Sequence, residues 1–384
     1  MNSHAPIVVI GTGLAGYHLV KELRKLAPEQ AILMITADDG RSYSKPMLST
    51  GFSKNKSADE LAIANAAEMA AQLNITVRTH TLVTAINPAA HTLNINDEVV
   101  AYSKLVLAMG AEVIRVPVAG DAQDKIFSIN DLQDYATFRK HADGKNRVVI
   151  MGGGLIGCEY ANDMREGGFE VDLVSLDNHL LPALLPAPAA DALQQGLENI
   201  GIRFHLGRTV QAVNHGDDGV VVETSAGDKL NADLVVSAIG LRSKTAIAKE
   251  AGIAINRGIQ VNRLLETSQP DIYALGDCAE VDGLVMHFVL PLMTCARTLA
   301  KTLAGTPTQV SYGVMPVTIK TPANPVVVSP PASGSEGNWH INADGLDLQA
   351  EFRDNSGQLL GYALTGSKGL NKVALNKELP AILL

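Results

Sequence analysis

The 384-residue chain contains few cysteines, and they are far apart: Cys158, Cys278 and Cys295, with no C-x-x-C pair. This excludes a disulfide framework and indicates a reducing, cytoplasmic setting. The ten histidines show no ligand-like spacing with the cysteines or with one another. We therefore expect no metal site.

Positive charge is also in short supply, with 31 basic against 40 acidic residues and a net charge of −9. A general affinity for nucleic acid or for anionic membranes is therefore not expected. No apolar run reaches the roughly 18 residues that a membrane-spanning helix needs. The apolar stretch 5–16 lacks a basic flank and contains spaced glycines, so we expect it to be part of the fold.

Two segments that start 141 residues apart, at Ile7 and Val148, share one plan. Each has a short apolar strand, a G-x-G-x-x-G motif and then apolar residues at helical spacing. In this motif the first glycine makes a tight turn, the second lets the backbone approach a pyrophosphate, and the third lets the helix pack closely. A single motif is weak evidence, but two copies in the right context predict two dinucleotide-binding units. The motif glycines are Gly11, Gly13 and Gly16 in the first copy, and Gly152, Gly154 and Gly157 in the second.

Each unit should hold its nucleotide through the residues that start the helix and those that end the second strand. In the first unit these are Leu14 and Ala15, then Ala37 and Asp38; in the second they are Leu155 and Ile156, then Asp177. The usual place of the ribose-binding acid in the second unit is occupied by Ser175. No arginine lies between Ser175 and Leu181 to bind a 2′-phosphate, which favours NAD over NADP.

The rest of the chain completes an α/β architecture with a small tail. Strand patterns end at Gly110, at Gly240 and at Gly276–Asp277, and a helical pattern runs from 292 to 303. After residue 312, prolines separate short apolar runs. There, 339–348 and 359–364 alternate like antiparallel strands, and 370–379 is typical of a helix. We predict two Rossmann-like domains, the first discontinuous (1–112 and 246–315) and the second at 113–245, followed by a small α+β C-terminal domain at 316–384.

These motifs together resemble the two-dinucleotide flavoprotein oxidoreductases, the glutathione-reductase-like superfamily, over nearly the whole chain. The resemblance implies FAD in the first domain and NAD(H) in the second. It also implies that Gly276 and Asp277 form the second FAD motif, and that Val83 and Val289 contact FAD through their backbone.

Disulfide reductases of this superfamily have a C-x4-C pair after the first unit, whereas this chain has no cysteine before Cys158. Instead, residues 43–49 read Y-S-K-P-M-L-S, followed by Thr50, and K-T-P stands at 320–322. This combination resembles the rubredoxin–NAD(+) reductase family. The resemblance implies electron transfer from NADH through FAD to rubredoxin in an alkane-hydroxylase chain. Flavorubredoxin or a [2Fe–2S] ferredoxin as acceptor, an NADH oxidase and a non-enzymatic FAD redox sensor remain alternatives.

The same resemblance suggests roles for individual side chains. Lys45 and Lys320 should contact FAD, and Glu159 should lie where nicotinamide meets flavin. Cys158, at the start of a helix, is either a reactive thiol or a small packing residue. Basic residues near the flavin motifs would dock an acidic iron protein: Arg41, Lys45, Lys54, Lys56, Lys320, Lys368 and Lys372.

Overall fold

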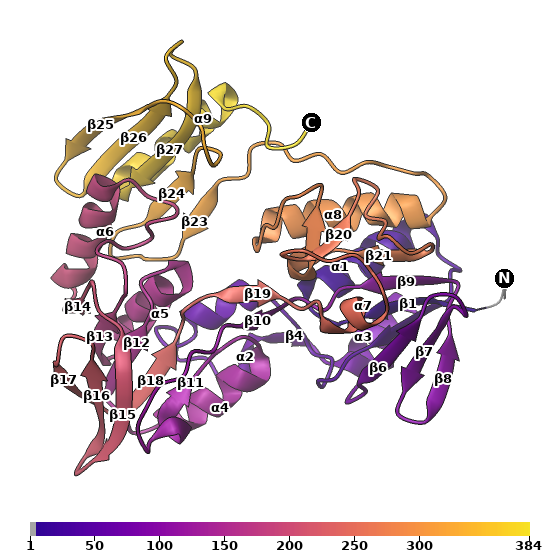
Figure 1. Cartoon of the computed structure of the whole chain (residues 1–384), viewed down its shortest axis with the longest axis horizontal. Coiled ribbons are helices and arrows are strands. Elements are labelled where there is room, and N and C mark those ends of the chain that lie inside the picture. Colours follow the sequence, from indigo (N-terminus) through magenta and orange to yellow (C-terminus); the bar gives the residue numbers. More distant parts are fainter. Residues whose placement is uncertain (1–4) are drawn as a thin grey trace.

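The structure is a computed structural model that describes residues 5–384 (Figure 1). Its first parallel sheet has the order β21-β9-β1-β2-β5. All residues of β1, β2 and β21 are buried, which explains why these strands are continuously apolar rather than alternating. The strands are β1 (Ile7–Ile10), β2 (Ile32–Ile35), β5 (Thr76–Arg78), β9 (Lys104–Leu107) and β21 (Ile272–Ala274).

The other elements of this first domain cover the sheet and extend its edge. Helices α1 (Leu14–Leu26) and α8 (Val289–Leu303) pack against each other, and α3 (Ala66–Leu73) lies beside α1. An antiparallel sheet consists of β6 (Val83–Asn87), β7 (Thr92–Ile95) and β8 (Glu98–Ala101). Smaller elements are β3 (Ser42–Tyr43), the 3-10 turn η1 (Lys45–Thr50), α2 (Ala58–Leu61), β4 (Ala62–Ala64), α7 (Ala246–Glu250), β20 (Ile259–Val261), η3 (Gly276–Cys278) and β22 (Ala279–Val281).

The second parallel sheet repeats the plan of the first, with the order β11-β18-β12-β13-β14. Its central strand β12 lies between β13 and β18, as β1 lies between β2 and β9. This repetition confirms the predicted pair of Rossmann-like units. The elements are η2 (Gln123–Lys125), β11 (Ile126–Phe127), α4 (Leu132–Ala142), β12 (Arg147–Met151), α5 (Leu155–Glu166), β13 (Glu170–Val174), α6 (Ala187–Asn199), β14 (Arg203–His205), β15 (Val210–Gly216), β16 (Gly219–Thr224), β17 (Lys229–Ala232) and β18 (Leu234–Ser237).

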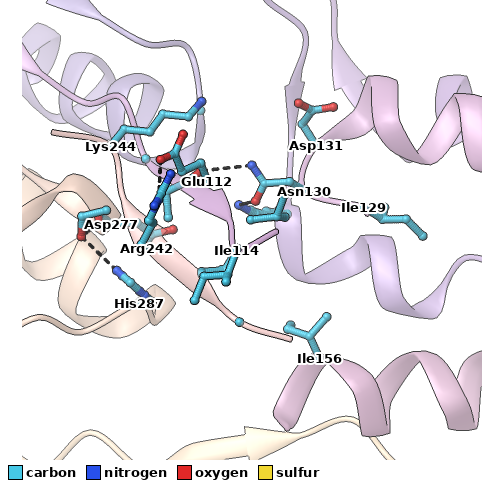
Figure 2. Close-up of a pocket in the computed structure, with 18 of the residues that line it drawn as sticks. Glu112, Ile114, Ile129, Asn130, Asp131, Ile156, Arg242, Lys244, Asp277 and His287 are labelled. Carbon is cyan, nitrogen blue, oxygen red and sulfur yellow. Dashed lines mark hydrogen bonds and ion pairs between the residues drawn. The ribbon is translucent and has the colours of Figure 1, made fainter. Parts of the chain in front are cut away.

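Two crossover strands join the nucleotide domains. β10 (Ala111–Val113) leaves the first domain, β19 (Leu241–Ser243) returns to it, and the two pair antiparallel. Glu112 and Arg242 face each other across this pair, with 2.7 Å between Oε1 and Nε (Figure 2). The two domains are therefore connected by a short hydrogen-bonded ribbon.

The C-terminal unit is an antiparallel sheet of order β23-β24-β27-β26-β25 with a helix at its end (Figure 1). Its strands are β23 (Val317–Ile319), β24 (Val326–Ser329), β25 (Asn338–Asp344), β26 (Asp347–Arg353) and β27 (Leu359–Thr365), followed by η4 (Gly366–Asn371) and α9 (Lys372–Glu378). The end of the chain then turns back toward the first domain, where Tyr312 and Leu383 exchange backbone hydrogen bonds of 2.7 and 3.0 Å.

Two boundaries predicted in this unit are wrong. The pattern over 339–348 is not one strand, because a two-residue turn at Gly345 and Leu346 separates β25 from β26. Such a tight turn leaves the alternation of apolar and polar residues almost unbroken, so the pattern over 339–348 resembles one strand. The glycine at 345 fits the turn, where its φ is +59°. The closing helix is shorter than 370–379, because its first turn is the 3-10 turn η4. Within residues 5–384, no helix is long and apolar enough to cross a membrane.

The third glycine of each motif is required by packing. A Cβ on Gly157 would lie 1.9 Å from the carbonyl oxygen of Gly152, and a Cβ on Gly16 would lie 2.1 Å from that of Gly11. By contrast, no described atom outside the local chain lies within 4 Å of a Cβ built on Gly13 or Gly154. The second glycines therefore face open space, whereas the third ones touch backbone.

This contrast predicts different effects of adding one methyl group. Gly157→Ala should lower the free energy of unfolding by roughly 1–3 kcal/mol, because helix α5 must move away from β12. Gly154→Ala should leave the thermal unfolding midpoint almost unchanged but weaken NADH binding, because its methyl enters the space for phosphate. Thermal unfolding and NADH titration of both variants check this, and equal midpoints for the two would contradict it.

Candidate functional site

One cavity of about 2010 Å³ lies between the two nucleotide domains and is lined by both glycine loops. Figure 2 shows some of the residues that line it. Most of the predicted site residues line it. They are Gly11, Gly13, Leu14, Ala15, Ala37, Asp38, Lys45, Val83, Asp277, Val289 and Lys320 for the first nucleotide, and Gly152, Gly154, Leu155, Ile156, Glu159 and Asp177 for the second.

Three predicted site residues, Gly16, Gly157 and Gly276, are not among the described residues that line the cavity. They lie behind its wall and let the helices come close. Gly276 has a φ of +75°, and a Cβ there would lie 2.8 Å from that of Ala15. These glycines therefore shape the site, and their predicted contact with the cofactors stays a prediction.

The starts of α1 and α5 fit a pyrophosphate. Among the described residues no side chain caps either helix, and neither first turn contains an acidic residue. The free N–H groups and the positive end of each helix dipole are thus available at the cavity. Together with the open space at Gly13 and Gly154, this gives each loop the form that a dinucleotide requires.

Asp38 lies at the cavity with its carboxylate held in place. Its Oδ1 accepts hydrogen bonds from the Thr36 hydroxyl (2.7 Å), the Gly40 amide (2.9 Å) and the Thr12 hydroxyl (3.3 Å). Because these bonds use Oδ1, Oδ2 is the oxygen that can accept from a ribose. This geometry fits the predicted ribose contact.

Lys45 is anchored by a residue that the sequence did not reveal. Its Nζ donates to Oδ1 of Asn130 (2.7 Å), and Nδ2 of Asn130 donates to the carbonyl of Ala111 (3.0 Å). Burial lowers the pKa of Lys45, and the carboxylates of Asp277 and Asp131 partly offset this (Figure 2). The lysine is thus a partly desolvated cation in the cavity wall.

The crossover ribbon holds the second predicted FAD motif. The Ser243 hydroxyl donates to the carbonyl of Asp277 (2.6 Å) and lies 3.2 Å from Nε2 of His287 (Figure 2). Ser243 and His287 both line the cavity and belong to no sequence motif.

The two residues predicted for the flavin–nicotinamide region, Glu159 and Lys320, form an ion pair. Oε1 of Glu159 accepts from the Lys320 amide (3.0 Å), and Oε2 contacts the Lys320 ammonium. The Ser49 hydroxyl donates to Oε2 (2.6 Å), and the Lys320 ammonium donates to Ser49 Oγ at 3.1 Å. Glu159 is only 1 % exposed, so these partners take the place of water around its carboxylate.

Helix α5 holds its neighbours through two further polar side chains. The buried carboxylate of Asp163 accepts from the amides of Phe52 and Ser53, both at 2.9 Å, and from the Ser53 hydroxyl at 2.6 Å. Oδ1 of Asn162 accepts from the Ala323 amide at 3.1 Å. One helix thus binds the segment after η1 on one side and the C-terminal unit on the other.

The second nucleotide half contains an arginine that the sequence reasoning missed. Arg208 lines the cavity near Ser175 and Asp177, and its amide donates to the carbonyl of Ser175 (2.8 Å). It lies 33 residues after Ser175 but follows β14, which pairs with β13 in the register Val174↔His205. Parallel strands end at the same edge of a sheet, so the pairing of β14 with β13 brings Arg208 beside Ser175. Only a prediction of that strand pairing would have identified Arg208 from the sequence.

Cys158 is fully buried in α5, and burial raises its pKa to about 12. The thiol is therefore protonated near neutral pH, so of the two alternatives the structure favours a packing residue. No cluster of three or more metal-ligating side chains occurs in the part of the chain that the structure describes.

Comparison with known proteins agrees with this geometry. Residues 5–300 match the family model "Pyridine nucleotide-disulphide oxidoreductase", and residues 309–379 match "Rubredoxin binding C-terminal domain". The chain is 56% identical to a rubredoxin-NAD(+) reductase of Alcanivorax borkumensis, covering 98% of this chain and 99% of that protein. The chain belongs to the pyridine nucleotide-disulphide oxidoreductase family. The cofactors of this family are FAD and NAD(H), as predicted.

Three further proteins are similar to this chain at lower sequence identity. It is 44% identical to a rubredoxin-NAD(+) reductase of Acinetobacter baylyi, covering 98% of each chain. It is 38% identical to a nitric oxide reductase FlRd-NAD(+) reductase of Aliivibrio fischeri, covering 97% and 98%. The NADH:rubredoxin oxidoreductase structure from Clostridium acetobutylicum has the same fold, with a TM-score of 0.81 at 22% identity over 97% and 94% of the two chains.

The Glu159–Lys320 pair predicts a large stability effect at a single position. Glu159→Gln should lower the free energy of unfolding by about 3 kcal/mol, because it leaves the Lys320 ammonium without its counter-charge. Urea unfolding measures this. Glu166→Gln, which removes an exposed carboxylate from the same helix, is the matched control. Equal stability of the two variants would contradict the prediction.

Proposed function

We propose that this protein transfers electrons from NADH through FAD to the iron of rubredoxin. One observation carries the proposal. Lys320, from the segment that matches the rubredoxin-binding domain, lines the same cavity as both glycine loops. A partner-binding unit that contributes to the cofactor cavity supports electron transfer at that point. The proposed boundaries remain 1–112 and 246–315, 113–245, and 316–384.

In this proposal the first glycine loop, Asp38, Lys45 and Asp277 hold FAD, and Val83 and Val289 contact it. The second loop and Asp177 hold NAD(H). When bound, FAD would supply the redox chemistry that links a two-electron hydride donor, NADH, to a one-electron iron centre. The protein's contribution is to bind and orient both groups and to place charge.

The charge comes from Lys320 and Lys45. A fixed cation at the flavin favours the reduced, more negative cofactor. Glu159 and Ser49 hold the Lys320 ammonium in one place, so we propose Lys320 as the cation at the flavin and Glu159 as the group that positions it.

For the electron acceptor, one of the relatives supports a second candidate besides rubredoxin. The 38% identical relative is named for FlRd, which keeps flavorubredoxin as the second candidate. A [2Fe–2S] ferredoxin, an NADH oxidase and a redox sensor are less well supported. We also propose a cytoplasmic location, which the three free, buried cysteines support, and a place in an alkane-hydroxylase chain.

An anaerobic titration tests the function. The yellow protein should be bleached by NADH and then reduce oxidised rubredoxin catalytically, with [2Fe–2S] ferredoxin as the control acceptor. Preference for ferredoxin would change the partner but keep the cofactors. If NADH did not bleach the flavin, electron transfer from NADH would be excluded.

A second prediction concerns docking. Arg41 is already paired with Asp39 and Asp59, and Lys45 and Lys320 have internal partners. Four residues are then left for docking: Lys54, Lys56, Lys368 and Lys372.

Lys368→Ala with Lys372→Ala should therefore raise the rubredoxin KM several-fold and leave the NADH KM unchanged, because opposite charges steer the encounter. The rubredoxin KM of the unaltered protein should also rise with ionic strength. Lys301→Ala, at the far end of α8 from the cavity, is the control. A rubredoxin KM that stays constant in the double variant would exclude these two lysines from docking.

A further inference from the structure

Arg208 stands where a coenzyme 2′-phosphate would be bound. Its amide donates to the carbonyl of Ser175, at the end of the second strand of the NAD-type unit, and the residue lines the cavity. In Rossmann-like folds this is the position of the ribose that carries the extra phosphate in NADP, and arginine is the residue that binds this phosphate. On position alone, Arg208 would favour NADPH.

The guanidinium is, however, already paired. Nη1 of Arg208 contacts Oδ2 of Asp228, and the Thr224 hydroxyl donates to the same oxygen at 2.7 Å. Asp228 belongs to the turn between β16 and β17, and it is not among the described residues that line the cavity. The Thr224 hydroxyl and then the Arg208 guanidinium lower the pKa of Asp228, so the pair is charged at neutral pH.

A second carboxylate acts in the same direction. Asp177 lies on the loop after β13, is exposed and lines the cavity. Its backbone carbonyl accepts a hydrogen bond from the amide of Gly207, the residue before Arg208. An arriving 2′-phosphate would thus meet one exposed carboxylate and an arginine whose guanidinium is already bound to Asp228.

We propose that Asp228 determines coenzyme specificity by holding Arg208 in an ion pair, so that the site rejects NADPH although it contains the arginine that would bind it. This is discrimination through an unfavourable contact with the wrong ligand. The inference rests on the proposed function only in taking a nicotinamide coenzyme as the occupant of this half of the cavity.

The test uses Asp228→Asn in the full-length flavoprotein. The amide keeps an acceptor for Thr224 but removes the charge, so Arg208 can turn to the phosphate. The NADPH/NADH ratio of kcat/KM for flavin reduction should rise about tenfold, the effect of one charge-assisted hydrogen bond. The affinity for 2′,5′-ADP relative to that for ADP, measured by calorimetry, should rise by a similar factor. This measurement requires no turnover.

Two further variants isolate the mechanism. The double variant Arg208→Gln with Asp228→Asn should return both ratios to the original values, because the gain depends on the arginine. Glu223→Gln removes a carboxylate from the same hairpin, one paired with Lys229 at 3.4 Å, and should change neither ratio.

Unchanged ratios in Asp228→Asn would overturn the proposal. So would an equal gain in Glu223→Gln, which would indicate bulk charge, or a gain that persists without Arg208. These outcomes differ from a failure of the proposed function, in which neither ADP nor 2′,5′-ADP would bind the unaltered protein. Because Asp228 is a partly exposed turn residue, we expect its variants to fold, and Asp228→Ser provides a second substitution with the same expected result.

Discussion

The arrangement of this protein depends on one buried carboxylate. Glu159 belongs to the helix of the second nucleotide unit, Ser49 to the first, and Lys320 to the C-terminal unit, and the three side chains contact one another. A carboxylate that is 1 % exposed requires both partners in place. The interaction therefore fixes polar groups of three parts of the chain against one another, beside the apolar cluster that the same parts share and at the wall of their common cavity.

Around this point the protein uses one nucleotide-binding plan twice. Four strands have the same order in the two parallel sheets, β9-β1-β2-β5 and β18-β12-β13-β14, and the glycine loops of both open into the same cavity. Two units of equal construction can present two nucleotides to each other, while small local differences separate their roles. In the first unit a carboxylate, Asp38, is held ready at the end of the second strand; in the second, Ser175 takes that place and Arg208 reaches it from the next strand.

The parts that could be predicted from the sequence are those set by local chemistry. A buried strand, a glycine turn and an amphipathic helix are recognisable within about 20 residues, so both nucleotide units and most of the residues in their loops were found. The partners of three site residues were not predicted, because the tertiary fold alone brings them together. They are Asn130 beside Lys45, Ser49 beside Glu159 and Arg208 beside Ser175. The turn at Gly345 was missed because it is too short to interrupt the alternation on either side.

The backbone contact between Tyr312 and Leu383 has a consequence for modularity. The C-terminal sheet lies between two points of the chain that are side by side, so this module is anchored to the first domain at both of its ends. Both ends of the module are fixed, which restricts it from rotating about a single linker. Because the module also contributes Lys320 to the cavity wall, a nucleotide-binding scaffold of this kind changes its protein partner and part of its cofactor site together.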